Sequence, residues 1–439
     1  MKKLIILFII ALFSLVACED ILDVKPKQDI PQDIAFNDEA SVRSTIVGCY
    51  DALQSTGYYG RYYVVVPDLL AGNLEHNGTT QEYAEFTNNA VQSDNFIIDG
   101  IWSSIYDGIN RVNMVIANID QAGMSTEDEN MYLAHAYFLR ALHHFNLVRM
   151  FGGVPIKREP STEPGEQLNV PRNSISEVYT QIELDLDFAE QHITDIFPGA
   201  ANLTVLNALR AKISLYQERW TDAKFYATEV INDNTYGLEP YFGDLYPAGN
   251  SMEGVFEILF NEQDNNLLAQ YFLPTAIGGR HEFIPSESFI NSFPEEDSIR
   301  LNNSVTEDSD GLYCSKYTEI STRSDNVYVF RLAEMYLIRA EAEAQLQGNI
   351  NDIQSDINMV RNRSDLGDTE ASTYEELLQA VAIERRRELA FEGHYWFDLV
   401  RTGSAMDSIP EVTSENQYLM PIPLSEMQTN DAMEQNPDY

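Results

Sequence analysis

Apolar residues recur at steps of three and four along most of the chain, which is the spacing of one face of an α-helix. The longest such stretches are Asp99–Ile119 and Glu127–Met150. Each would have to bury its apolar stripe against a neighbouring element. Shorter stretches with the same period lie at residues 37–54, 176–192, 205–216, 222–231, 331–347, 351–361 and 375–401. The pattern therefore predicts a mostly α-helical fold.

The predicted helices follow one another in pairs that would bury their apolar stripes together. Ala208–Ala227 resembles a tetratricopeptide unit, because small and large residues alternate along it. The pairs are unevenly spaced, so we expect irregular helix pairs with insertions at about residues 55–98 and 238–326. The second insertion contains one predicted strand, Val255–Asn261. Long loops on a helical scaffold are where binding residues usually lie.

The segment Thr373–Gly403 places charged residues on an otherwise apolar helix face, where Arg385 joins Leu378 and Val381. Its acidic and basic residues alternate at spacings that allow ion pairs: Glu384, Glu388, Glu392 and Asp398 with Arg385, Arg386, Arg387 and Arg401. Three interpretations are open, namely an exposed charged face, a half-buried ion network and, least favoured, a nucleic-acid patch. Gly393 is predicted to end the first helix in a left-handed cap.

Charge excludes several kinds of partner. The 439 residues include 69 acidic and 28 basic side chains, which gives a formal net charge of −41. Nucleic acid and anionic lipid surfaces would both be repelled, so we predict no nucleic-acid partner. The length suits two or three ordinary cores, or one large helical body with inserted loops.

The first residues have the pattern of an export signal. Lys2 and Lys3 precede an apolar run, Leu4–Val16, that ends in a small-residue site before Cys18. We predict a lipoprotein signal peptide over residues 1–17, lipidation of Cys18 and a tether over residues 18–36. The alternative is an ordinary signal peptide with an incidental cysteine. Cys49 and Cys314 would form a disulfide or, more commonly for isolated cysteines, lie buried as free thiols.

Four long motifs resemble the SusD/RagB family of outer-membrane nutrient-binding lipoproteins. They are AYFLRALHHFNLVRMFGGVPI (136–156), FRLAEMYLIRAEA (330–342), ERRRELAFEGHYWFDLVRTG (384–403) and the ending PIPLSEMQTNDAMEQNPDY (421–439). The resemblance implies a single SusD-like domain over residues 37–439, built from tetratricopeptide-like helix pairs with long insertions and a few short strands. It also implies lipid anchoring at the cell surface, for which Glu19 and Asp20 resemble an export signal, and a SusC-like TonB-dependent transporter as partner.

Tyrosines and arginines in the two insertions are the candidate ligand-binding residues, since glycans favour aromatic platforms beside planar polar groups. Arg61 precedes the DLLAGN segment, where starch-binding members of the family carry a binding arginine. The candidates are Tyr58, Tyr59, Arg61, Tyr62, Asn73, His76, Asn77, Tyr83, Tyr271, Arg280, His281 and Phe283. Starch-binding members carry tryptophan here and this chain does not. The tyrosine cluster fits a strand with alternate rings buried equally well, because Tyr62–Val66 has strand propensity. Trp102, Trp220 and Trp396 are predicted to pack in the core.

No motif indicates catalysis or a bound cofactor. The chain has no glycine-rich phosphate loop, nucleophile elbow or HExxH pattern. His135, His143 and His144 lack partners at ligand spacing, so we expect packing or surface roles and no metal. Glu307–Gly311 fails the EF-hand pattern, which leaves open only an irregular structural calcium site in this loop.

The sequence therefore predicts a non-catalytic lipoprotein that binds oligo- or polysaccharide and delivers it to the transporter. By resemblance, the helical side would face the transporter and the loop side would hold ligand. RagB-like peptide binding is the first alternative, since a loop of tyrosines, arginine and asparagine also suits extended backbone. A surface glycoside hydrolase is the second and weaker one, because its two carboxylates cannot be identified among 69 acids.

Overall fold

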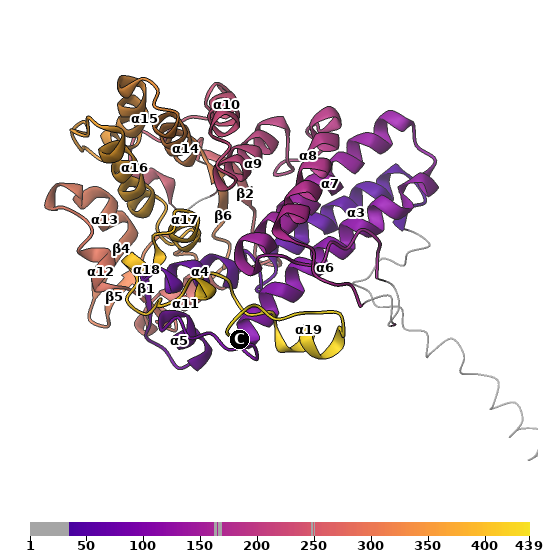
Figure 1. The fold of residues 1–439 in the computed structure, drawn as a ribbon, viewed down its shortest axis with the longest axis horizontal. Helices are drawn as coiled ribbons and strands as arrows, with labels where there is room; N and C mark the ends of the chain where they lie inside the picture. The colour runs from indigo at the N-terminus through magenta and orange to yellow at the C-terminus, as the bar shows by residue number, and fades with distance from the viewer. Residues whose placement is uncertain (1–34, 162–164, 166–168, 247–248, 250) are drawn as a thin grey trace, which may run out of the picture.

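The computed structural model describes residues 35–439 apart from 162–164, 166–168, 247–248 and 250 (Figure 1). The predicted signal peptide, Cys18 and most of the tether lie outside these residues. Ala35 and Phe36, which the sequence assigned to the tether, are buried in the core. No described helix is both long and apolar enough to cross a bilayer.

The helices follow the periodic segments closely. Their bounds are α3 Glu39–Asp51, α6 Phe96–Asn118, α7 Thr126–Phe151, α8 Ile175–His192, α9 Leu203–Tyr216, α10 Trp220–Ile231, α14 Leu332–Gln345, α15 Ile350–Asn362, α16 Tyr374–Glu388 and α17 Tyr395–Arg401. Local sequence explains where several of these helices begin. Asp38, Ser174 and Thr373 each form a reciprocal capping box with the residue three positions later, at the starts of α3, α8 and α16.

Neighbouring helices pack as the periodicity requires. α6, α7 and α8 lie against one another in sequence order, followed by α9 with α10, and α14 packs against α10, α15 and α16. In Figure 1 these helices form an arc, with α3, α6, α7 and α8 at one end and α14–α16 at the other. Trp102 and Trp396 are buried, as predicted, while Trp220 is half-buried at the start of α10.

The two insertions contain more regular structure than the sequence suggested. The first holds α4 Tyr62–Leu70, β1 Leu74–His76 and α5 Gln81–Thr87, so Tyr62–Val66 is helical and the predicted strand is wrong. The second holds β2 Gly254–Ile258, α11 Leu268–Phe272, β3 Phe283–Pro285, α12 Glu287–Ile290, α13 Ser298–Ser304, β4 Val305–Asp308 and β5 Gly311–Cys314. After it come β6 Val327–Arg331 and, near the C-terminus, α18 Ala405–Ser408 and α19 Leu424–Thr429. The strands form three antiparallel pairs, β1–β3, β2–β6 and β4–β5.

A buried ion network joins the C-terminal helices to the second insertion. Arg331 donates to Glu388 at 2.6 Å, to Glu392 at 2.7 Å and to Glu253 at 2.8 Å, and all four side chains are at most 1% exposed. Burial alone would raise the pKa of Glu388, but Arg363, Arg331 and Arg300 lower it to about 2. Of the three interpretations of this segment, the ion network is the correct one: Arg385 is buried, while Arg386 and Arg387 are half-buried.

The predicted cap at Gly393 is in the wrong place. α16 ends at Glu388, five residues earlier, although Gly393 does adopt a left-handed φ of +79°. The turn between them is held by buried Asp68 of α4, which accepts hydrogen bonds from the N–H groups of Phe391 at 3.2 Å and Gly393 at 3.1 Å. A side chain on Gly393 would crowd the carbonyl oxygen of Tyr63. Tertiary contacts, and not the glycine alone, therefore end the helix.

Cys49 and Cys314 are both buried free thiols, which settles the choice between disulfide and buried side chain. Burial raises the pKa of each thiol to about 12, so both stay protonated at neutral pH.

Substitution of Glu388 by Gln should lower the free energy of unfolding by about 3–5 kcal/mol, because Arg331 and Arg363 would each lose a buried charged partner. Chemical denaturation of the mature chain measures this change. Asp107→Asn is the matched control, because its ion pair with Arg111 is about half exposed and should contribute less than about 1 kcal/mol. Equal effects of the two substitutions would contradict the expectation.

The stability difference between the wild type and Glu388→Gln should also depend on pH. The pKa of Glu388 is about 2 in the folded chain and about 4.3 in an unfolded chain. A depressed pKa contributes stability above the unfolded value, and this contribution is lost as pH falls through the folded value. The difference should therefore be largest above about pH 5 and shrink towards pH 2. Denaturation series at several pH values test this, and a constant difference would count against an ionised Glu388.

Candidate functional site

The two insertions meet through one short strand pair. β1 and β3 run antiparallel with His76 opposite Phe283, and the N–H of Asn77 donates to the carbonyl of Glu282 at 2.8 Å. This pairing gathers most of the candidate residues, which we call the arginine–tyrosine cluster. Its members are Arg61, Tyr62, His76, Asn77, Tyr83, Tyr271, Arg280, His281 and Phe283. Residues about 200 positions apart in sequence thus share one site.

The ring of Tyr271, at the end of α11, is the centre of the cluster. The guanidinium carbon of Arg61 lies 3.7 Å from the ring centroid and that of Arg280 lies 4.6 Å from it. Arg280 also donates from Nη1 to the Tyr271 hydroxyl at 3.0 Å. Two cations therefore share one aromatic ring, an arrangement that the ring quadrupole stabilises.

Arg61 is buried, with 5% of its surface exposed. It also contacts the ring of Tyr62 at 4.7 Å. Within the described residues its Nε and Nη1 atoms are buried without a hydrogen-bond partner. Unfilled buried donors are costly. Both atoms are themselves buried, so an oxygen atom of water or of a ligand would have to enter beside them to satisfy them. The surface next to Arg61 is formed by Arg280, which is 43% exposed, with exposed Asn77 and half-buried Tyr62.

Glu282 holds the loop after β1 in place, a role that sequence reasoning missed. Its Oε1 contacts His76 Nε2 at 3.2 Å and accepts from the Thr80 N–H at 2.8 Å, and Oε2 lies 3.7 Å from Arg280 Nε. Burial opposes ionisation, but the hydrogen bonds from Thr80 and His76 lower the pKa of Glu282 below its usual range. A side chain at Gly78 would collide with this carboxylate. No local signal marks Glu282, because its partner His76 is 206 residues away.

The other cluster members pack or form hydrogen bonds beneath the exposed surface. Tyr83 packs edge-on against Phe283 with centroids 4.7 Å apart, and both rings are buried. His281 Nε2 lies 2.9 Å from the carbonyl of Leu312 in β5, while the Asn77 side chain donates to the carbonyl of His281 at 3.0 Å. The cluster is thereby connected to the β4–β5 hairpin.

Tyr58, Tyr59 and Asn73 do not reach the cluster. Both tyrosine hydroxyls accept from Asn146 of α7, at 2.5 Å and 2.9 Å, and neither ring is more than 6% exposed. Asn73 is fully buried and donates to Asp68 at 2.8 Å. The turn before α4 presents its first two rings to α7. All three side chains are therefore buried and hydrogen-bonded within the fold.

The loop 307–311 forms the turn of the β4–β5 hairpin, where Asp308 accepts from the Asp310 N–H at 2.8 Å. Across the described residues no group of histidine, cysteine and acidic side chains is arranged to hold a metal ion. His135, His143 and His144 are buried in α7, and His135 lies within hydrogen-bonding distance of Tyr50 and the carbonyl of Thr194.

Two family models match the sequence. One described as the SusD family matches residues 296–411, and one described as starch-binding associating with outer membrane matches residues 20–204. SusD-like protein P2 of Formosa agariphila is 27% identical over the full length of both chains, and SusD-like protein P25 of the same organism is 25% identical over 97% of this chain and 96% of its own.

Solved structures agree with these matches. A SusD superfamily protein from Bacteroides vulgatus superposes with a TM-score of 0.84 at 20% identity, covering 92% of this chain and all of the other. A structure titled laminarin binding SusD-like protein gives 0.81 at 25% identity with the same coverage. Together with the four motifs and the helical arc, these findings show that the chain belongs to the SusD/RagB family.

Proposed function

We propose that the protein is a cell-surface lipoprotein that binds an oligo- or polysaccharide at the arginine–tyrosine cluster and passes it, uncleaved, to a SusC-like TonB-dependent transporter. The observation that carries the proposal is Arg61. Its guanidinium is stacked on Tyr271 while Nε and Nη1 lack a partner among the described residues. Donors held rigidly beside aromatic rings suit a ligand rich in hydroxyl groups.

The similar proteins support a glycan as the ligand. One structural neighbour is named for laminarin binding, and the starch-binding protein SusD of Bacteroides thetaiotaomicron is 24% identical over 73% of this chain. The tryptophans that the resemblance places in starch sites are absent here, and tyrosine and arginine occupy the cluster instead. We therefore propose glycan binding without assigning starch as the ligand.

Delivery to a transporter and absence of cleavage complete the proposal. The helix pairs present a broad surface for a second protein, and the cluster lies on the insertions, away from the α8–α10 helices (Figure 1). Among the described residues, Glu282 is the carboxylate that contacts the cluster, and its oxygens already bind His76 and Thr80. A glycosidase needs two suitably separated carboxyl groups. Incubated starch and laminarin should therefore keep their chain length.

Removal of the cluster's cationic donors should weaken glycan binding. Arg280→Ala and Arg61→Met should each raise the dissociation constant about tenfold or more, because each loses charged donors to the ligand. Affinity electrophoresis and calorimetry with starch, laminarin and a peptide panel measure this. Lys224→Ala is the matched control, because Lys224 is 44% exposed and Arg280 is 43% exposed.

The same panel separates the alternatives. Peptide binding without any glycan response would replace the proposal with the RagB-like function, and shortened polymer would point to hydrolysis. Unchanged glycan affinity in both arginine variants would remove the cluster as the binding site.

Lipid anchoring predicts the effect of Cys18→Ala. Without the thiol that carries the acyl chains, the mature chain should move from the outer-membrane fraction to the soluble fraction. Fractionation with detection of the chain measures this, and protease treatment of intact cells tests surface exposure of the wild type. Membrane retention of the variant would count against Cys18 as the anchor.

A further inference from the structure

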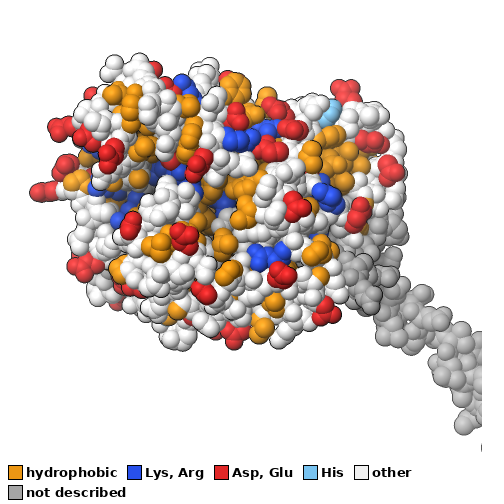
Figure 2. Space-filling model, in the orientation of Figure 1, with side chains coloured by type: hydrophobic (Ala, Val, Ile, Leu, Met, Phe, Trp, Pro, Cys, Tyr) orange, Lys and Arg blue, Asp and Glu red, His pale blue; other side chains and the backbone are white. Residues whose placement is uncertain are grey.

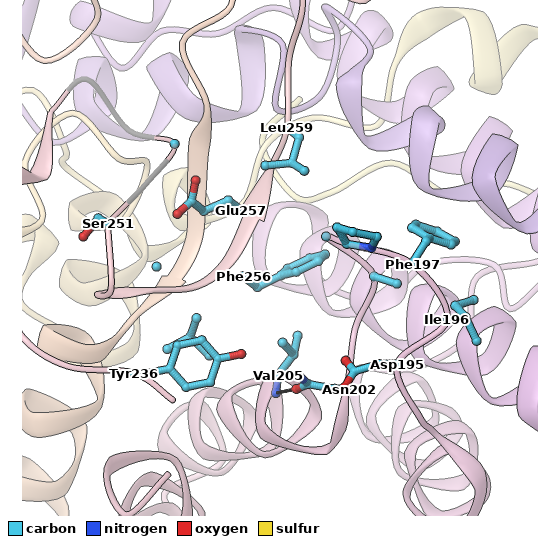
Figure 3. A pocket seen from close by; sticks show the side chains of 16 residues that line it. Asp195, Ile196, Phe197, Asn202, Val205, Tyr236, Ser251, Phe256, Glu257 and Leu259 are labelled. Carbon is cyan, nitrogen blue, oxygen red and sulfur yellow. Dashed lines mark hydrogen bonds between the residues drawn. The ribbon is translucent and has the colours of Figure 1, made fainter. Parts of the chain in front are cut away.

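A hollow lies beside the start of α9, apart from the arginine–tyrosine cluster. It is a cavity of about 580 Å³ between the α8–α9 loop, β2 and the segment after α10 (Figure 3). Tyr236 and Phe256 both extend into it from different segments, and Phe197 lines its edge. Tyr236 and Phe197 are half-buried, so parts of their rings remain accessible. Aromatic rings at the surface of a cavity of this size are typical of small-molecule sites.

Two other cavities adjoin this hollow, because each shares lining residues with its neighbour. A neighbouring cavity of about 250 Å³ shares Phe197, Phe256, Glu257 and Leu259 with it. That cavity in turn shares Asp51, Gln54 and Asp264 with a third, of about 550 Å³, beside α6. We call the three together the second groove. Three adjoining cavities suit an extended chain better than a compact molecule.

The lining changes from aromatic to polar along the groove. At the α6 end, Ala52 is the apolar residue among lining side chains that otherwise carry carboxylate, amide, hydroxyl or guanidinium groups. Carboxylates, amides and hydroxyls of this kind can donate to and accept from sugar hydroxyls. A protein partner would instead favour an apolar patch with few charges at its centre.

Charge restricts the occupant further. Asp51, Asp107 and Asp264 line the polar end, and Arg111 is the basic residue among them, pairing with Asp107 at 2.9 Å and Asp51 at 3.6 Å. At the aromatic end Asp195 and Glu257 add acidic groups. Burial raises the pKa of Glu257 to about 7, so the negative charge is concentrated at the polar end. An anionic polymer would be repelled there, whereas an uncharged one would not.

The groove is separate from the arginine–tyrosine cluster. Thr56 lines the groove, and its carbonyl accepts from the N–H of Tyr62, which belongs to the cluster. Between them, Gly57 packs so closely against the carbonyl of Gly100 in α6 that a side chain would collide with it. The turn is therefore fixed to α6 and divides the two sites.

We propose that the second groove is an additional binding site for an uncharged glycan chain. Sugar rings pack on Tyr236 and Phe197 at one end, and hydroxyl groups bond to the amide and carboxylate side chains at the other. This inference rests on the proposed glycan-binding function, but it uses different residues. The mature chain would then bind two glycan segments at once, which increases the avidity for a long polymer.

Calorimetry with maltoheptaose and laminarihexaose on the mature chain tests the proposal. Binding of the active oligosaccharide should show two equivalents per chain. Tyr236→Ala removes a ring, and Ser103→Trp fills the polar end from an exposed position on α6. Each should abolish one equivalent or weaken it more than tenfold. Ser176→Trp, at an exposed serine of α8, is the matched control and should keep both. Thermal melting confirms that each variant is folded.

The variants distinguish the two sites. If Arg61→Met and Arg280→Ala abolish all binding while Tyr236→Ala and Ser103→Trp leave stoichiometry and affinity unchanged, the second groove is refuted and the proposed function stands. If only the groove variants lose binding, the groove stands and the cluster is not the glycan site. Absence of binding by either oligosaccharide to the wild type would overturn both.

Discussion

Burial of charge in the C-terminal half determines where the second insertion can lie. Arg331 at the end of β6 contacts Glu388 of α16, Glu392 of the following turn and Glu253 just before β2. Lys316, after β5, reaches Glu392 at 2.8 Å. Each of these charges would be strongly destabilising alone, so the segments that carry them can be buried only together. The insertion is therefore fixed to the helical scaffold at both ends, and the residues between, including Tyr271, have defined positions.

The periodic helices could be predicted because their signals are local. In α6 and α7 the apolar stripe and the cap residue belong to the same segment, and the predicted bounds differ from the observed ones by at most three residues. α4 could not be predicted in this way. Apart from Asp68 its sequence is apolar, it contains Pro67, and eight of its nine residues are buried. No face therefore distinguishes a helix from a strand. The end of α16 was missed for a related reason, since Asp68 of α4 forms the turn.

The arginine–tyrosine cluster was predictable in composition but not in arrangement. Sequence pattern and resemblance pointed to both insertions, yet no pattern in one chain shows that His76 pairs with Phe283 or that Glu282 holds the loop between them. The directions in which the tyrosine rings point could not be predicted from the sequence either. Tyr58 and Tyr62 belong to one turn, but the first faces Asn146 of α7 and the second faces Tyr83. The packing of that turn against α7 and α6 determines which of the two rings is exposed at the surface.

The other buried arginines show how the surroundings of Arg61 differ from theirs. Arg331, Arg300 and Arg385 each contact two or more carboxylates. Arg149 is held by the hydroxyls of Tyr63 and Tyr216 and by the amide oxygen of Asn146, with aromatic rings around it. In a chain with 69 acidic residues, a carboxylate is an accessible partner for almost any arginine. Arg61 instead has aromatic rings as neighbours and two donors unfilled in the described structure, whereas Arg149 and Arg385 each have one. Such donors destabilise the free protein, and under the proposed function a ligand would supply the missing oxygen atoms to Arg61.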